Sequence, residues 1–325
     1  MLVGIYHPEF WISHGHWSYE NQTPGKTGRW GNTNYRINDK SLREADFIVI
    51  HEGMDRSIKN ATAGGFVLVT GEEKSIRKYY HPEYLDQFDL IITSRDDIRH
   101  PQIKRTHYLH PWWVKKNYDE LASSTSPTKT KTLSAIISNL AVLPSHRERF
   151  TFIKALKEHY ENNLDWFSKG ESSFLRDKWD GLAPYKYSIA VENSNHLNYF
   201  TEKISDCFLA HTMPIYQGCP NIKDFFDDRS FISIDKNDFL GAIQIIDHSI
   251  SENLFERNFR YLEESRRLVL EKYHFIAALS DILQNHWPGK EKIKRTLRPE
   301  EYFTRGRFEQ FRRFANTSIK KVLGR

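Results

Sequence analysis

The residues best suited to chemistry lie between Tyr185 and Ile222, in the segment YKYSIAVENSNHLNYFTEKISDCFLAHTMPIYQGCPNI. This segment joins an apolar strand pattern, a polar Glu-Asn-Ser turn, a helix start and a second strand pattern. Lys203 falls in the first turn of that helix, where unpaired backbone N–H groups and the positive end of the helix dipole lie. A lysine there opposes the dipole unless an anion binds. The residues alone leave two interpretations open, an anion site or a solvated surface lysine.

Strand and helix patterns alternate on both sides of this segment. Strands are predicted at 2–6, 47–52, 66–72, 90–94, 133–138, 187–192, 213–217 and 231–234, and helices at 74–86, 145–160, 201–211 and 254–285. Such alternation predicts an α/β protein whose parallel sheets are covered on both faces. Site residues in these proteins lie at the carboxyl ends of the strands.

The length of 325 residues suits two domains of roughly 150 residues each. Residues 123–131, SSTSPTKTK, contain no apolar side chain and are predicted to form a linker. We therefore expect an N-terminal Rossmann-like domain at 1–122 and a second Rossmann-like domain at 132–289, facing each other across a cleft. Residues 290–325 form a separate basic tail in this interpretation.

Three motifs resemble the signature of glycosyltransferase family 10, the fucosyltransferases that use GDP-fucose, in its bacterial form. They are the turn Glu192-Asn193-Ser194, a tyrosine two residues before Thr-Glu-Lys, and Pro214-Ile-Tyr-Gln-Gly218. The resemblance covers about residues 130–240 and implies a GT-B-like fold, with the acceptor on the first domain and the GDP-sugar on the second. It implies these donor-binding residues: Asn139, Arg147, Glu192, Asn193, Ser194, Tyr199, Thr201, Glu202 and Lys203.

The resemblance also implies roles for individual residues. Lys203 would contact the diphosphate, while Glu202 and Asn193 would orient ribose or fucose hydroxyls. The family carries an arginine aimed at the phosphates at the offset of Arg149, although Arg147 lies close enough to take that place. Positive groups there would stabilise the charge that grows on the leaving GDP. Arg149 and Lys203 are therefore candidate catalytic residues.

Inverting transfer from GDP-β-L-fucose, as the resemblance implies, needs a carboxylate that takes the proton of the acceptor hydroxyl. Glu72 lies at the carboxyl end of the strand predicted at 66–72 and is the candidate base, with Glu73 adjacent to it and Glu52 at the end of the previous strand. Glu72 could instead cap the helix predicted at 74–86. Trp112 and Trp113 are candidates for stacking on the acceptor sugar, or for the core.

We predict no cofactor and no required divalent metal, because Lys203 and Arg149 would supply the positive charge. His14 and His16, with His7, Glu9 and Glu20 nearby, are weak candidates for metal ligands, since no cysteine supports them. The acidic pairs Asp96-Asp97 and Asp227-Asp228 are not convincingly placed to hold a metal on a nucleotide.

The tail holds twelve lysines or arginines against four glutamates, with phenylalanines spaced among them. It is predicted either to contact an anionic membrane or to pack back on the body. Only two cysteines and no signal-peptide pattern occur, so we expect a cytoplasmic protein, peripheral on the inner membrane in the first interpretation. No nucleic-acid partner is expected.

The predicted function is fucosyl transfer to a GlcNAc- or galactose-containing glycan, with lipid-linked acceptors included. An α-1,3 linkage in surface polysaccharide or lipopolysaccharide synthesis fits this prediction. Two alternatives remain: the same fold using another GDP-deoxyhexose, and a non-catalytic glycan- or nucleotide-binding protein.

Overall fold

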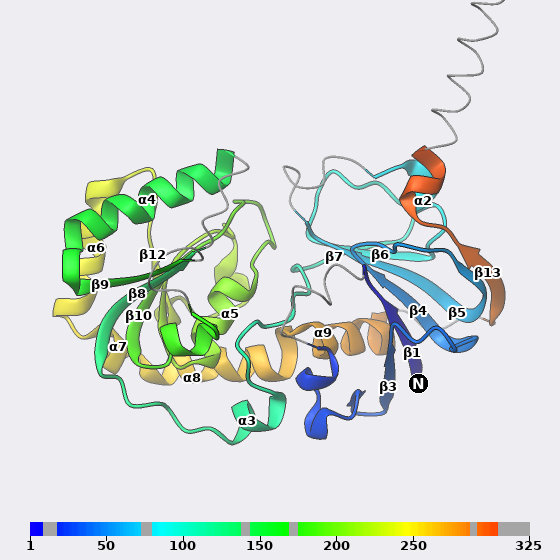
Figure 1. Ribbon diagram of the computed structural model, residues 1–325, viewed down its shortest axis with the longest axis horizontal. Coiled ribbons are helices and arrows are strands. Elements are labelled where there is room, and N and C mark those ends of the chain that lie inside the picture. Colours follow the sequence, from blue (N-terminus) through cyan, green and yellow to red (C-terminus); the bar gives the residue numbers. More distant parts are fainter. Residues whose placement is uncertain (9–17, 73–79, 138–143, 169–174, 287–290, 305–325) are drawn as a thin grey trace, which may run out of the picture. The chain divides into compact units, whose positions relative to one another are not determined.

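The strand and helix patterns fold into two α/β units, each built on its own sheet (Figure 1). The computed structural model describes residues 1–8, 18–72, 80–137, 144–168, 175–286 and 291–304. Unit 1 comprises Met1–Ser13, Thr33–Arg105 and Pro288–Arg325, and unit 2 comprises His14–Asn32 and Thr106–Trp287. The predicted α/β class is confirmed.

The sheet of unit 1 runs in the order β3, β1, β4, β5, β6, β7, with neighbouring strands parallel. Its strands are β1 (Leu2–Tyr6), β3 (Thr33–Ile37), β4 (Glu44–His51), β5 (Ile58–Thr70), β6 (Leu90–Thr93) and β7 (Ile103–Arg105). The apolar runs of β4, β5 and β6 are buried, as expected for central strands covered on both faces. Helix α2 (Pro82–Leu85) occupies the end of the helix predicted at 74–86, and residues 73–79 lie outside the described residues.

Two connections in unit 1 cross the sheet without a helix. Residues 38–43 join β3 to β4, and residues 52–57 join β4 to β5, and neither segment contains a helical turn. Connections between parallel strands are usually longer and helical. The part of the sheet that these two segments cover is therefore packed by loop side chains.

The bounds of the separate tail predicted at 290–325 are corrected, because its first described residues belong to unit 1, as in the alternative in which the tail packs on the body. Strand β13 (Ile293–Leu297) pairs antiparallel with the first half of β5. Behind it, Glu300 accepts a hydrogen bond from the backbone N–H of His81 (2.6 Å), and Phe303 stacks on the His81 ring. This strand was not predicted for two reasons. Its composition is basic, and its pairing partner β5 lies more than 200 residues away in the sequence. Residues 305–325 lie outside the described residues.

Unit 2 contains a parallel sheet in the order β12, β11, β10, β8, β9. The strands of this sheet are β8 (Lys131–Ile137), β9 (Leu164–Ser168), β10 (Tyr185–Val191), β11 (Met213–Gln217) and β12 (Ile232–Ser233). The residues of unit 2 also include the short strand β2 (Arg29–Trp30), which is not part of this sheet. The helices are α3 (Tyr118–Ser123), α4 (Pro144–Tyr160), α5 (Glu202–Leu209), α6 (Phe239–Ser251), α7 (Leu254–Arg257), α8 (Phe259–Leu268) and α9 (Phe275–Asp281). Helices α4 and α8 lie on opposite sides of the sheet (Figure 1).

The helix predicted at 254–285 forms, but in three pieces. Asn253 has a left-handed backbone (φ 52°) before α7, and α8 ends in a π-helical turn, Val269–Tyr273. His274 is then extended, which separates α8 from α9, and a second π-helical turn, Ile282–His286, follows α9. In the described part of the chain, no helix is both long and apolar enough to cross a membrane.

The predicted linker at 123–131 lies inside unit 2, and the nearest boundary between the units falls between Arg105 and Thr106. Lys129 donates hydrogen bonds from Nζ to Ala183 O (2.8 Å), Ala210 O (2.9 Å) and Thr212 Oγ1 (3.1 Å). The backbone N–H groups of Thr130 and Lys131 both donate to Pro184 O. Polar composition suggested a flexible linker here, but these side chains and amides are held by fixed acceptors.

We expect Lys129→Met to lower the free energy of unfolding by about 1–3 kcal/mol, because three oxygen acceptors lose their donor. Lys154→Met is the matched control, since the pair of Lys154 with Glu158 on α4 is exposed and such pairs contribute little. Urea unfolding of both variants measures the difference. Equal midpoints for the two variants would contradict a structural role for Lys129.

Candidate functional site

The predicted donor-site residues of unit 2 converge at the carboxyl end of its sheet. Strand β10 ends at Val191, and Glu192 and Asn193 follow it directly. Arg149, in the second turn of α4, is buried, and its guanidinium donates a hydrogen bond to Asn193 Oδ1. Helix α4 and strand β10 thereby bring two of the predicted residues into contact.

Glu192 fixes the start of α5 to the end of β10. Its buried carboxylate accepts hydrogen bonds from the backbone N–H (2.8 Å) and the hydroxyl (2.8 Å) of Thr201, and it pairs with Lys203 Nζ (3.2 Å). Gly218, at the end of β11, leaves room for this carboxylate. A Cβ at Gly218 would lie 2.4 Å from Glu192 Cγ and 2.4 Å from Tyr216 Oη. The glycine of the Pro-Ile-Tyr-Gln-Gly motif is therefore explained by sterics, because any side chain at this position would clash with Glu192 and Tyr216.

Lys203 is held by acidic neighbours at the positive end of α5. Its Nζ lies 3.2 Å from Glu192 and 3.6 Å from Glu202, and it donates to Thr201 Oγ1 (3.0 Å). Thr201 also caps α5 by accepting from the Lys203 backbone N–H (3.4 Å). The side chain of Lys203 keeps 19% of its surface exposed, so a ligand can still reach it. The negative charges of Glu192 and Glu202 thus offset the unfavourable interaction of the Lys203 ammonium with the positive end of the helix dipole.

Arg149 and Lys203 are linked through two adjacent residues, because Arg149 bonds to Asn193 and Lys203 pairs with Glu192. In the first turn of α4, the pKa of His146 is lowered first by burial and then by the charges of Arg149 and Lys203. Two fixed cations at a helix start and at strand ends form an environment that favours a phosphate or diphosphate.

The cluster of side chains that holds Glu202 was not predicted from the sequence. Lys178 Nζ lies 3.3 Å from Glu202 and 3.2 Å from Asp206, and His110 Nδ1 lies 3.7 Å from Glu202. Asp206 also accepts a hydrogen bond from the backbone N–H of Trp113 (2.9 Å). Only the four-residue spacing of Glu202 and Asp206, which places both on one face of α5, could have indicated this pair.

The pKa shifts in this cluster follow from burial and from the alternating charges. Burial opposes the ionised form of Glu202, but Lys203 and Lys178 outweigh it and hold its pKa well below the usual range. Burial raises the pKa of Asp206 to about 6, although Lys178 acts against this. Burial lowers the pKa of His110 to about 4, so its ring is neutral at pH 7. Glu202 therefore stays charged near neutral pH.

The two adjacent tryptophans, considered either for acceptor stacking or for the core, have different environments. Trp112 is 2% exposed and belongs to the core, and its Nε1 donates to Lys116 O (2.9 Å). Trp113 is 40% exposed, and its ring lies under the Lys178 ammonium (5.2 Å) and beside His110 (5.8 Å). Of these two tryptophans, Trp113 is the one whose ring is accessible to a ligand, and it lies next to the Glu202 cluster.

The remaining predicted donor residues differ in how they are placed. Tyr199 is buried and stacks parallel to Tyr108 (6.1 Å) and against His196 (4.6 Å). Ser194 bonds to His196 Nδ1 (3.0 Å). Arg147 is exposed, on the outward side of α4, where it lines a hollow with Lys236 and Phe239. Asn139 lies outside the described residues.

Glu72, the candidate base, lies in unit 1, just after β5. Glu52 follows β4 and holds the loop that carries Glu72: it accepts from the backbone N–H groups of Gly71 (2.6 Å) and Glu72 (3.2 Å), and from Thr70 Oγ1 (2.9 Å). The backbone of Glu52 is left-handed (φ 62°), an unfavourable conformation for a glutamate. Its carboxylate is committed to these donors, so Glu52 is better explained as a support for Glu72 than as the base.

The acidic pairs considered for a metal are engaged with basic side chains. Asp97 pairs with Arg95 (2.7 Å), Asp227 with Arg229 (2.7 Å) and Asp228 with Lys223 (3.2 Å). Among the residues that the structure describes, no group of three or more His, Cys, Asp or Glu side chains could hold a metal. His14 and His16 lie outside those residues.

Comparison with known families confirms the resemblance to glycosyltransferase family 10. Residues 126–264 match the family model described as glycosyltransferase family 10 (fucosyltransferase) C-term. The α-(1,3)-fucosyltransferase FucT of Helicobacter pylori is 35% identical over 74 residues, 23% of this chain and 15% of that protein. The α-(1,3)-fucosyltransferase 4 of Bos taurus is 39% identical over 70 residues, 21% of this chain and 17% of that protein. The matches thus span less than a fifth of either relative.

A solved structure with a TM-score of 0.50 confirms the GT-B-like fold class. An α-glucosyltransferase in complex with UDP and DNA covers 88% of this chain and all (100%) of its own, at 10% identity and a TM-score of 0.50. An α-1,3-fucosyltransferase with GDP-fucose covers 83% of this chain and 92% of its own, at 18% identity and a TM-score of 0.48.

We expect Lys178→Met to destabilise the protein by about 3 kcal/mol at pH 8, because two buried carboxylates lose their shared cation. Without Lys178 the pKa of Asp206 rises beyond its present value of about 6. A carboxyl group whose pKa is raised by folding stabilises the protein at low pH and loses that effect as pH rises through the folded pKa. The deficit of the variant should therefore be smaller at pH 5 than at pH 8, as thermal unfolding measures.

Lys178→Arg keeps the charge and serves as the control. The double variant Lys178→Met/Asp206→Asn should recover part of the loss at pH 8, because one of the two unpaired charges is gone. A deficit of the same size at both pH values, with no recovery in the double variant, would show that Lys178 stabilises by packing alone.

Proposed function

We propose that this protein transfers L-fucose from GDP-fucose to a hydroxyl of a GlcNAc- or galactose-containing glycan, with inversion at the anomeric carbon. One observation carries the proposal: Arg149, Asn193 and Lys203 meet at the carboxyl end of the unit 2 sheet, inside the segment that matches the fucosyltransferase family model. The relatives named above as α-(1,3)-fucosyltransferases support fucose and an α-1,3 linkage.

In this proposal the diphosphate of the donor lies between Arg149 and Lys203. Cleavage of the bond between fucose and the diphosphate leaves an extra negative charge on GDP, and both cations stabilise that charge. They take the role that a divalent metal has in other sugar transferases, so the reaction proceeds without one. Glu202, held in its charged form by Lys178 and Lys203, accepts hydrogen bonds from hydroxyls of the ribose or the fucose.

Glu72 is the proposed base. It takes the proton of the acceptor hydroxyl while the hydroxyl oxygen attacks the anomeric carbon from the face opposite to GDP. The loop that carries Glu72 is fixed through its backbone by Glu52. Trp113 is the proposed platform for the sugar ring. We also propose that the enzyme works in surface polysaccharide or lipopolysaccharide synthesis, in the cytoplasm or on the inner face of the membrane.

The first test measures GDP release from GDP-fucose with lactosamine-type acceptors in the presence of EDTA. We expect acceptor-dependent release by the wild type and a loss of about 100-fold or more in kcat/KM for Lys203→Ala, the usual effect of removing a group that stabilises developing charge. Lys154→Ala, an exposed lysine of α4, should behave as the wild type.

Each other result of that test has a distinct meaning. Activity with a different GDP-deoxyhexose and none with GDP-fucose would overturn the donor. Loss of activity in EDTA that Mn²⁺ or Mg²⁺ restores would overturn the metal-independent mechanism. Thermal protection by GDP without turnover of any GDP-sugar would favour a non-catalytic binding protein.

A second test concerns the base. Glu72→Gln should lower kcat by about 10²–10⁴-fold, because the amide cannot take a proton, while GDP affinity stays unchanged. Glu83→Gln, an exposed residue of α2, is the matched control. Single-turnover rates and GDP titrations separate the two effects. A variant that keeps its kcat would transfer the role of base to another carboxylate.

A further inference from the structure

Unit 1 contains a cavity of about 900 Å³ that the proposed reaction does not use. It lies where the two helix-free connections, 38–43 and 52–57, cross the sheet. Pockets for small molecules range from about 300 to 1,000 Å³, so this cavity is large enough for an organic ligand. Its size follows from topology, because a loop fills less space over a sheet than a helix does.

The inner wall of the cavity is mostly apolar. Tyr6, at the end of β1, Leu42, Met54 and Ile58 line it. The hydroxyl of Tyr6 donates to Asp39 O (2.9 Å), so this polar atom is already satisfied and the ring presents its apolar surface. A ligand part that enters here is recognised mainly by removal of apolar surface from water.

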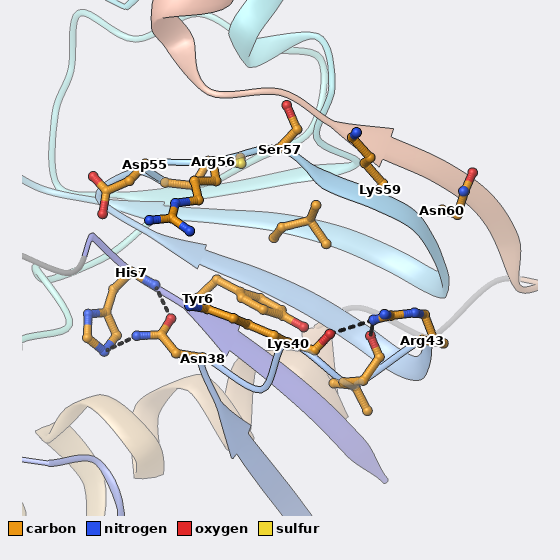
Figure 2. Close-up of a pocket in the computed structure, with 13 residues that line it drawn as sticks. Tyr6, His7, Asn38, Lys40, Arg43, Asp55, Arg56, Ser57, Lys59 and Asn60 are labelled. Carbon is orange, nitrogen blue, oxygen red and sulfur yellow. Dashed lines mark hydrogen bonds between the residues drawn. The ribbon is translucent and has the colours of Figure 1, made fainter.

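The rim of the cavity is cationic. Figure 2 shows Arg56 and Arg43 on two sides of Tyr6, with Lys40 beside Arg43, and Lys59 at the start of β5. Asp55 is the one carboxylate among the lining residues. Arg43 is held in place, because its guanidinium donates to Lys40 O (2.6 Å). Four cations against one acid give the rim a positive potential.

These cations differ from other basic residues of unit 1. Lys292 pairs with Glu44 (3.0 Å) and Asp46 (3.2 Å), and Arg295 pairs with Asp89 (3.3 Å). By contrast, the side chains of Arg56 and Lys59 are exposed and form neither an ion pair nor a hydrogen bond with any residue that the structure describes. Unlike charges that balance one another on the surface, these two are available to a ligand.

We propose that this cavity binds an amphiphilic organic anion, with a phosphate ester at the cationic rim and an apolar chain against Tyr6, Met54 and Ile58. The proposal does not depend on fucosyl transfer, because all its residues belong to unit 1 and none of them takes part in the proposed reaction. A free alkyl phosphate and the headgroup of an anionic lipid share this chemistry, and the experiment separates them.

The experiment titrates the full-length protein with decyl phosphate, below its micelle concentration, by isothermal calorimetry with saturating GDP present. We expect saturable binding that weakens with salt and by at least about fivefold in Lys59→Glu. Lys104→Glu, on β7 at the other edge of the same sheet, is the matched control and should bind as the wild type. Ser57→Trp, an exposed lining position, should block binding by filling the cavity.

Three results would overturn the proposal. They are equal binding of decyl phosphate by wild type, Lys59→Glu and Ser57→Trp, equal affinity for decyl maltoside, which lacks the charge, and equal affinity for inorganic phosphate, which lacks the chain. Sedimentation with phosphatidylglycerol vesicles then identifies the source of the ligand. Vesicle binding that Lys59→Glu abolishes would support a membrane lipid, and decyl phosphate binding without vesicle binding would support a soluble phosphate ester.

Discussion

The buried carboxylate of Glu192 is the contact on which the geometry of the unit 2 site depends. It joins the end of β10 to the start of α5 through Thr201, and it positions the ammonium of Lys203. An isolated charge buried at this position would be strongly unfavourable, so the carboxylate requires all of these partners. Gly218 is part of the same arrangement, because any side chain there would meet Glu192.

Unit 1 contains a comparable arrangement, in which a glutamate carboxylate at a strand end holds a neighbouring loop. Glu52 follows β4, and its carboxylate binds the backbone N–H groups of the loop after the neighbouring strand β5. In both units, therefore, a glutamate at one strand end fixes a segment that carries a proposed functional group, Lys203 in one case and Glu72 in the other. A carboxylate that accepts hydrogen bonds from several donors holds the segment firmly, because each additional hydrogen bond further restricts its conformation.

The sequence predicted the features that depend on local pattern. The central strands, α4, α5 and the α/β class follow from apolar periodicity, and the position of Lys203 follows from the start of α5. Features that depend on distant partners were missed or misread. Strand β13 pairs with β5 across the length of the chain, and Lys129 finds its acceptors 54 to 83 residues away. Lys178 meets Glu202 and Asp206 from the short 3₁₀ helix Lys178–Gly181.

The order of charges around Glu202 also bears on how the site would respond to an anionic ligand. Glu202 is shared by Lys203 and Lys178, and Lys178 is shared in turn by Glu202 and Asp206. In the proposed reaction Lys203 would turn toward the diphosphate, and Glu202 would then lose part of one cation but keep the other. Lys178 therefore keeps Glu202 ionised, and able to accept hydrogen bonds, at the moment when its first partner is engaged. The effects of substitutions in this row of charged residues on stability should not be additive, because a change at one residue alters the partners of its neighbour.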